Sequence, residues 1–134
     1  MRIGSLANAL QYSSSGLTAE RFRMDTISSN IANANTVAKP GEEGYHRRAV
    51  VLNATDGGVQ IESIQEDRER PCLQKIDWSN PYHDPSTGMV TMSNVDPTME
   101  MVDMISASRA YEANISAFNT VKGMITSALQ IGKA

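Results

Sequence analysis

The chain has 134 residues, enough for one ordinary domain, and carries a formal net charge of −3. This charge argues against a general nucleic-acid binder, because such a protein needs a basic surface to displace counterions. No apolar run approaches the roughly 18 residues of a membrane span, and the single Cys72 excludes an internal disulfide framework. Residues 1–15 are too often broken by Gly, Asn and Ser for a cleavable signal peptide, so we expect a different route if the protein leaves the cytoplasm.

Helix-breaking residues are concentrated in the middle of the chain. All five Pro lie between residues 40 and 97, and five of the nine Gly lie between residues 41 and 88. The sequence therefore predicts an α+β fold, in which long N- and C-terminal helices are paired as a coiled coil and flank a small β-rich region. We place the helices at residues 1–36 and 97–134 and the β-rich region at residues 37–96.

The N-terminal segment carries apolar side chains at a spacing of seven residues. The repeat consists of Ile3, Leu10, Leu17, Met24 and Ile31, with Leu6 and Ile27 at the companion position. Ser13 and Glu20 interrupt that companion position, so only one edge of a coiled-coil seam is complete. Residues 13–16 are poor helix formers, which cost an isolated helix about 2 to 3 kcal/mol relative to Ala.

The apolar repeat then runs into "SSNIANANT", residues 28–36, where small residues and amides replace a core pattern. Asn33 and Asn35 tolerate the left-handed conformation that ends many helices, so we expect one of them to adopt it. Asn30 is placed to cap the helix or to cross-link backbone where the chain leaves it. A plain helix end with no role between subunits is the alternative.

The middle region contains four runs that are typical of short strands, at residues 45–52, 57–64, 72–78 and 88–92. Asp56-Gly57 between the first two runs is a strong hairpin-turn signal. About 60 residues of short strands make a marginal core, so we expect this region to pack on the helices or on another subunit.

The C-terminal helix has a well-marked start. Asp96 is a good N-cap, Pro97 suits the first helical position, and Glu100 favours the positive end of the helix dipole. Gly132 is a plausible stop. The apolar positions of this helix are Met104, Tyr111, Phe118 and Ile125, joined by Met101, Ile115, Val121 and Leu129.

Two helices of matched length at the two ends of one chain predict an antiparallel pair. A self-contained helical hairpin is one interpretation. However, a two-helix hairpin leaves much of each apolar stripe uncovered, and the alanines outside the main seams allow further helices to approach closely. We therefore expect neighbouring chains to complete the helix pair.

Candidate chemistry is sparse. His46 and His83 have no metal-ligand spacing around them, and the adjacent acids Glu42 and Glu43 lie in a predicted loop. Cys72 has no partner nearby in the sequence. We expect no catalytic residue, no metal, no cofactor, no small-molecule substrate and no enzymatic activity.

The two ends of the chain resemble the bacterial flagellar axial family of rod and hook proteins. "SGLTAERFRMDTISSNIANANT" (15–36) is similar to its N-terminal signature, and "EMVDMISASRAYEANISAFNTVKGMITSALQIG" (100–132) to its C-terminal signature, centred on S-R-x-Y-x-A-N. "GMVTMSNVD" (88–96) is similar to the G-Y-V-x-M-P-N-V-D segment of the proximal-rod members. Met89 and Ser93 depart from it, where those members have Tyr and usually Pro.

The resemblance implies a structural subunit of the basal-body rod that transmits torque across the periplasm. It implies copies of the same chain and other rod proteins as partners, and unfolded export by the flagellar type III apparatus. Another rod or hook protein of the same axial family, a monomeric helical-hairpin binding module and a peptidoglycan-acting enzyme are the competing hypotheses. The predicted subunit-interface residues are Ile3, Leu6, Leu10, Leu17, Met24, Ile27, Asn30, Ile31, Asn33, Met101, Met104, Tyr111, Asn114, Ile115, Phe118, Ile125 and Leu129.

Overall fold

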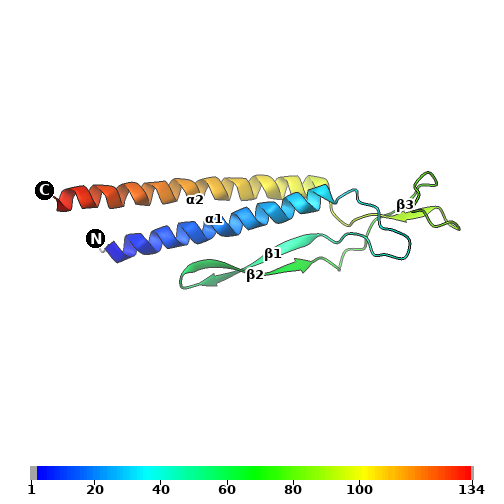
Figure 1. The fold of residues 1–134 in the computed structure, drawn as a ribbon, viewed down its shortest axis with the longest axis horizontal. Coiled ribbons are helices and arrows are strands. Elements are labelled where there is room, and N and C mark those ends of the chain that lie inside the picture. The colour runs from blue at the N-terminus through cyan, green and yellow to red at the C-terminus, as the bar shows by residue number, and fades with distance from the viewer. Residues whose placement is uncertain (1–2, 134) are drawn as a thin grey trace. The chain divides into compact units, whose positions relative to one another are not determined.

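The computed structural model describes residues 3–133, with the side chain of Ile3 outside the description, and it confirms the predicted α+β fold (Figure 1). Two long helices stand at the two ends of the chain, and four strands form two separate two-stranded sheets between them. The elements are α1 (Ile3–Ala32), β1 (Arg48–Thr55), β2 (Gly58–Glu66), β3 (Gln74–Ile76), β4 (Met89–Thr91) and α2 (Pro97–Gly132). Among the described residues, no helix is both long enough and apolar enough to span a membrane.

Helix α1 is continuous through the poor helix formers at residues 13–16. Ser15 Oγ donates to the Tyr12 carbonyl (2.8 Å) and accepts the backbone N–H of Val59 in β2 (3.1 Å). A Cβ at Gly16 would lie 2.9 Å from the Asn114 side chain of α2, so a larger residue there would displace that amide. Tertiary contacts at these positions therefore offset their weak helix propensity.

The expectation that Asn33 or Asn35 ends α1 in the left-handed conformation is wrong. Among the described residues only Gly41, Gly58 and Gly88 have positive φ. The helix instead tightens at its end, where the N–H of Ala34 bonds the carbonyl three residues earlier (3.2 Å). The Ser29 carbonyl accepts both the backbone N–H of Asn33 (3.1 Å) and its side-chain amide (2.8 Å), so the helix ends without a left-handed residue.

The start of α2 is as predicted. Asp96 Oδ1 accepts the backbone N–H groups of Thr98 (2.9 Å) and Met99 (3.4 Å), which is an N-cap, and Pro97 is the first helical residue.

All four predicted strands exist, with shorter or shifted bounds. Asp56 and Gly57 form the turn between β1 and β2. Strands β3 and β4 are antiparallel with Lys75 opposite Val90. β1 begins three residues after the predicted position, and the residues before it bond partly through side chains, including those of Tyr45 and Asn94.

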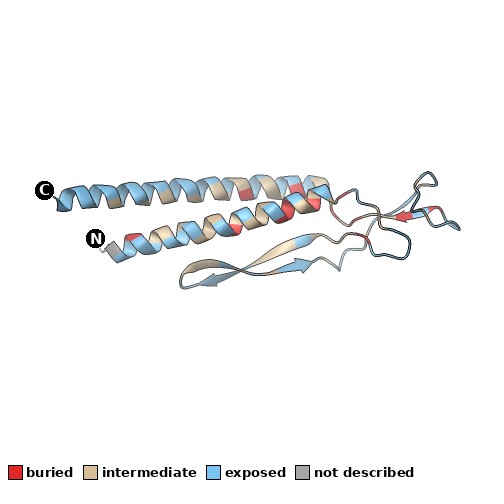
Figure 2. Cartoon of the chain, in the orientation of Figure 1, coloured by how far each residue is buried: buried red, intermediate tan, exposed pale blue. Residues whose placement is uncertain are grey.

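The chain packs as two compact units, and each takes residues from both helices and from the middle region. The described parts are 3–24, 50–63 and 105–133 in the first unit, and 25–49 and 64–104 in the second. In the first unit, the N-terminal part of α1 and the C-terminal part of α2 run in opposite directions (Figure 1). Burial is sparse there and denser in the second unit, which contains all four of the buried polar side chains (Figure 2).

Candidate functional site: a buried polar junction and an exposed apolar helix face

The second unit contains a polar junction that joins the last turns of α1, the first turn of α2 and the segment before β1. We define it by Asn30, Tyr45, Arg47, Arg48 and Glu100. Asn30 and Glu100 are both 0% exposed, and they are the largest fully buried side chains of the described residues. Buried polar groups are tolerated only when their hydrogen bonds are made, so the geometry around these two decides the stability of the junction.

Both the oxygen and the nitrogen of the Asn30 side-chain amide form hydrogen bonds. Its Oδ1 accepts the Arg48 backbone N–H (3.0 Å) and the Tyr45 hydroxyl (3.0 Å). Its Nδ2 donates to the Arg48 carbonyl (2.8 Å) and to Glu100 Oε2 (2.9 Å). A carboxamide carries both a donor and an acceptor, so it can pair with one residue's backbone as a neighbouring strand does. The prediction that Asn30 cross-links backbone at the helix exit is confirmed.

Arg47 neutralises the buried carboxylate of Glu100. Its Nε binds Glu100 Oε1, and its second guanidinium arm reaches Asp103 Oδ2 at 3.1 Å. Burial alone lowers the pKa of Arg47, but the hydrogen bond to Glu100 and the charges of Glu100 and Asp103 outweigh it, so the pKa lies above its ordinary value. The guanidinium therefore stays charged throughout the ordinary pH range. Sequence reasoning gave Glu100 only a helix-dipole role and missed Arg47, because no local pattern links the two positions.

The chain segment before α2 supports the junction from one side. Asn94 Oδ1 accepts the Arg47 backbone N–H (2.6 Å), and its Nδ2 donates to the carbonyls of Asp67 (2.7 Å) and Arg70 (3.0 Å). Ser93 Oγ bonds the Ala34 carbonyl (2.5 Å) and the Val95 N–H (3.3 Å). Ser93 thus holds the turn that precedes the helix.

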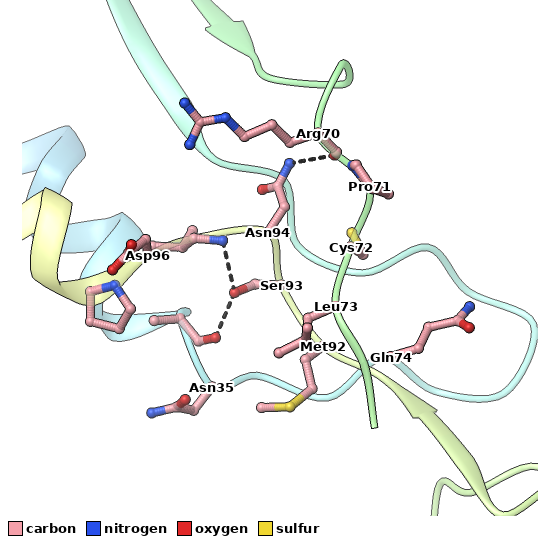
Figure 3. A pocket seen from close by; sticks show the side chains of 13 residues that line it. Asn35, Arg70, Pro71, Cys72, Leu73, Gln74, Met92, Ser93, Asn94 and Asp96 are labelled. Atoms are coloured by element: carbon pink, nitrogen blue, oxygen red, sulfur yellow. Dashed lines mark hydrogen bonds between the residues drawn. The ribbon is translucent and has the colours of Figure 1, made fainter. Parts of the chain in front are cut away.

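An open cleft of about 760 Å³ lies beside Ser93 and Asn94, between residues 70–74 and 92–97 (Figure 3). Asp96, which is among the residues that line the cleft, is the N-cap of α2. Within the described part of the chain, no group of three or more His, Cys, Asp or Glu is placed to hold a metal ion. The arrangement provides structural hydrogen bonds between the segment before α2 and the rest of the second unit.

The predicted interface residues fall into three classes of exposure. Those that are buried are Leu6, Ile27 and Asn30. Those that are half-buried are Leu10, Leu17, Met24, Ile31, Asn33, Met104, Tyr111, Asn114, Phe118 and Ile125. Those that are exposed are Met101, Ile115 and Leu129. The side chain of Ile3 lies outside the described residues.

Helix α2 carries exposed large hydrophobic residues both within and outside its predicted seam. The exposed large hydrophobic residues on α2 are Met99, Met101, Val102, Ile105, Ile115, Met124, Leu129 and Ile131. On α1, Tyr12 is the one exposed large hydrophobic residue of the described part. Sequence reasoning missed five members of the α2 set, although a helix with more apolar positions than one seam can hold was the available signal.

A second exposed apolar group lies around β3 and β4. It consists of Leu73, Ile76, Trp78, Tyr82 and Met89. Trp78 is 60% exposed, with its ring packed over Gly88 and tilted against His83 at a centroid distance of 5.5 Å. These side chains do not form a closed core within the described chain.

Two families of flagellar basal-body rod proteins match the two ends of the chain. The family described as flagella basal body rod protein matches residues 10–38, and the family described as flagellar basal body rod FlgEFG protein C-terminal matches residues 86–131. These ranges include Asn30, Ser93 and Glu100 of the described structure.

Similar full-length relatives carry one name. The flagellar basal-body rod proteins FlgC of Borreliella burgdorferi and Bacillus subtilis are each 38% identical over 148 residues, covering 94% of this chain and 97% of the relative. FlgC of Aquifex aeolicus is 40% identical over 120 residues, covering 86% of this chain and 88% of the relative.

Proposed function

This chain belongs to the family of the flagellar basal-body rod protein FlgC, and from that premise we propose that it is a structural subunit of the proximal rod. Its terminal helices would assemble with copies of the chain and with other rod proteins into a helical tube. The tube would transmit torque across the periplasm.

The observation that carries this proposal is the apolar surface of α2. Val102 is 58% exposed, with Met99, Met101 and Ile105 exposed within one helical turn of it. Contiguous exposed apolar patches on a folded chain mark surfaces that another molecule covers. A contact between unlike surfaces of identical chains does not close on itself, and it generates an open helical assembly.

The predicted interface residues take different roles in this proposal. The exposed Met101, Ile115 and Leu129 contact neighbouring subunits directly, together with the rest of the α2 surface. The half-buried seam residues complete their packing against neighbouring helices. The buried residues Leu6, Ile27 and Asn30 act indirectly, because they hold the chain's own helices in position.

The region around β3 and β4 supplies a second contact surface in the proposed rod. Trp78 and Ile76 are among its exposed large side chains, and short two-stranded sheets leave strand edges that invite pairing unless a neighbour covers them. Contact with an adjacent subunit would cover both the apolar side chains and the edges.

We also propose that the chain reaches the rod through the flagellar type III apparatus, the route that the likeness of its two ends to flagellar rod proteins implies. A structural role requires no catalysis, and a cell-wall hydrolysis assay separates it from a peptidoglycan-acting enzyme. A monomeric binding module would leave the α2 surface uncovered, which the exposure of Val102 and its neighbours disfavours.

Fractionation tests the proposed role. Cells that express a tagged copy of the chain in place of the native one are expected to retain motility and to yield purified basal bodies that contain the tag. The tag is expected to stay with the rod when the basal bodies are extracted. It is expected to be absent from the detached filament fraction. Intact basal bodies without the tagged chain, in cells that swim, would overturn the proposal.

A further inference from the structure

The junction places a carboxylate where the helices alone provide no compensating charge. Glu100 of α2 is fully buried, and the neutral amide of Asn30 on α1 donates a hydrogen bond to it. The positive charge comes from Arg47, which belongs to neither helix. Among the described residues, Arg47 is the one cation at ion-pair distance from Glu100.

A buried charge without its partner is strongly disfavoured, since it loses its hydration and gains nothing in return. If the last turns of α1 closed against the first turn of α2 before Arg47 arrived, Glu100 would be such a charge. We propose that residues 45–48 form a strap whose docking is required for the two helices to pair at the junction. The pairing of the helices and the start of β1 then occur as one cooperative step.

The strap contacts every element that it would have to coordinate. Tyr45 and the Arg48 backbone bond Asn30 of α1. Arg47 binds Glu100 and Asp103 of α2 through its side chain. Its backbone N–H bonds Asn94 in the segment that leads into α2. Docking therefore requires both helices and the preceding segment to be in place together.

In a rod subunit, α2 can expose its apolar residues to a neighbour in the right position only after residues 45–48 have docked. A chain whose residues 45–48 are not docked has its helices unpaired at the N-terminal end of α2, beside Met101 and Val102. This consequence rests on the proposed function, whereas the strap itself is a property of the single chain. A measurement on dilute protein tests the strap without any assembly.

Hydrogen exchange followed by mass spectrometry on the purified full chain is the direct test. In Arg47→Met, the amides of residues 26–32, 98–104 and 45–49 are expected to lose protection together, by about a hundredfold, because the closed junction then buries an unpaired carboxylate. Arg68→Met is the matched control. Its side chain is exposed and pairs with Glu66 at 3.1 Å, outside the junction, so protection should stay near that of the wild type.

A double variant separates a charge-dependent strap from a general loss of stability. In Arg47→Met/Glu100→Leu no charge is buried, so residues 26–32 and 98–104 are expected to regain protection although residues 45–49 exchange fast. If Arg47→Met does not fold at all, recovery of helix protection in the double variant still shows that the unpaired Glu100 charge opened the junction.

Three results would overturn the proposal. The first is a loss of protection in Arg47→Met confined to residues 45–49, with the helices unchanged. The second is a double variant whose helices are as unprotected as those of Arg47→Met. The third is a wild-type chain without protection in any of the three segments, since the strap would then not close the helices of the single chain.

Discussion

Val102→Asp is expected to abolish incorporation of the chain into the rod while leaving the fold of the subunit intact. The Val102 side chain is 58% exposed in the single chain, so a carboxylate there stays in water until a neighbouring subunit covers it. Burying it in an apolar contact then costs several kcal/mol, roughly 3 or more, and each subunit added to the rod repeats that cost. Motility in soft agar and the protein content of purified basal bodies measure the effect.

The matched control is Gln60→Asp, which changes the net charge by the same amount at an exposed position of β2. It is expected to leave motility and rod content near wild type. The circular dichroism of purified Val102→Asp should match that of the wild-type chain, because the Val102 side chain is mostly exposed in the single chain. Swimming cells with Val102→Asp in their rods would show that this part of α2 is not an interface.

Asn30→Ala is expected to lower the free energy of unfolding by about 3 to 4 kcal/mol, since it leaves several buried partners unsatisfied. The Arg48 backbone loses two of its hydrogen bonds, and Glu100 Oε2 loses its donor. A polar group buried without a partner costs more than a hydrogen bond contributes, and a carboxylate costs most. Denaturant unfolding of the purified chain measures the change from the midpoint and slope.

Asn35→Ala serves as the control, because Asn35 belongs to the same "SSNIANANT" stretch but is exposed. Its effect should stay within about 0.5 kcal/mol. Equal effects of the two substitutions would mean that the junction contributes little to stability.

The sequence predicts those parts of the fold that depend on neighbouring residues. The seven-residue repeats identify both helices, Asp96 and Pro97 give the start of α2, and Asp56-Gly57 gives the hairpin turn. Each of these signals acts within a few residues, so it survives in any tertiary context.

The contacts that fix the junction were not predictable in this way. Arg47 and Glu100 are separated by 53 positions, and nothing in either local pattern pairs them. The sequence predicts that Gly16 weakens the helix, because Gly is a poor helix former. In the structure its missing side chain makes room for Asn114. The end of α1 was predicted wrongly because Asn33 and Asn35 permit a left-handed residue without requiring one.

The exposed surface of α2 was missed for a different reason. Heptad reasoning selects one seam, and it treats other apolar positions as incidental. Val102 and Ile105 lie outside that seam, so their importance emerges only when the fold leaves them in water.

Electron density of the assembled basal body at side-chain resolution tests the central claim most directly. We expect this chain in the proximal part of the rod, with Met101, Val102 and Ile105 of each subunit buried against neighbouring subunits. Asn30 and Glu100 should remain bonded within their own chain. Density that shows these three α2 side chains facing solvent, or a proximal rod built without this chain, would contradict the account.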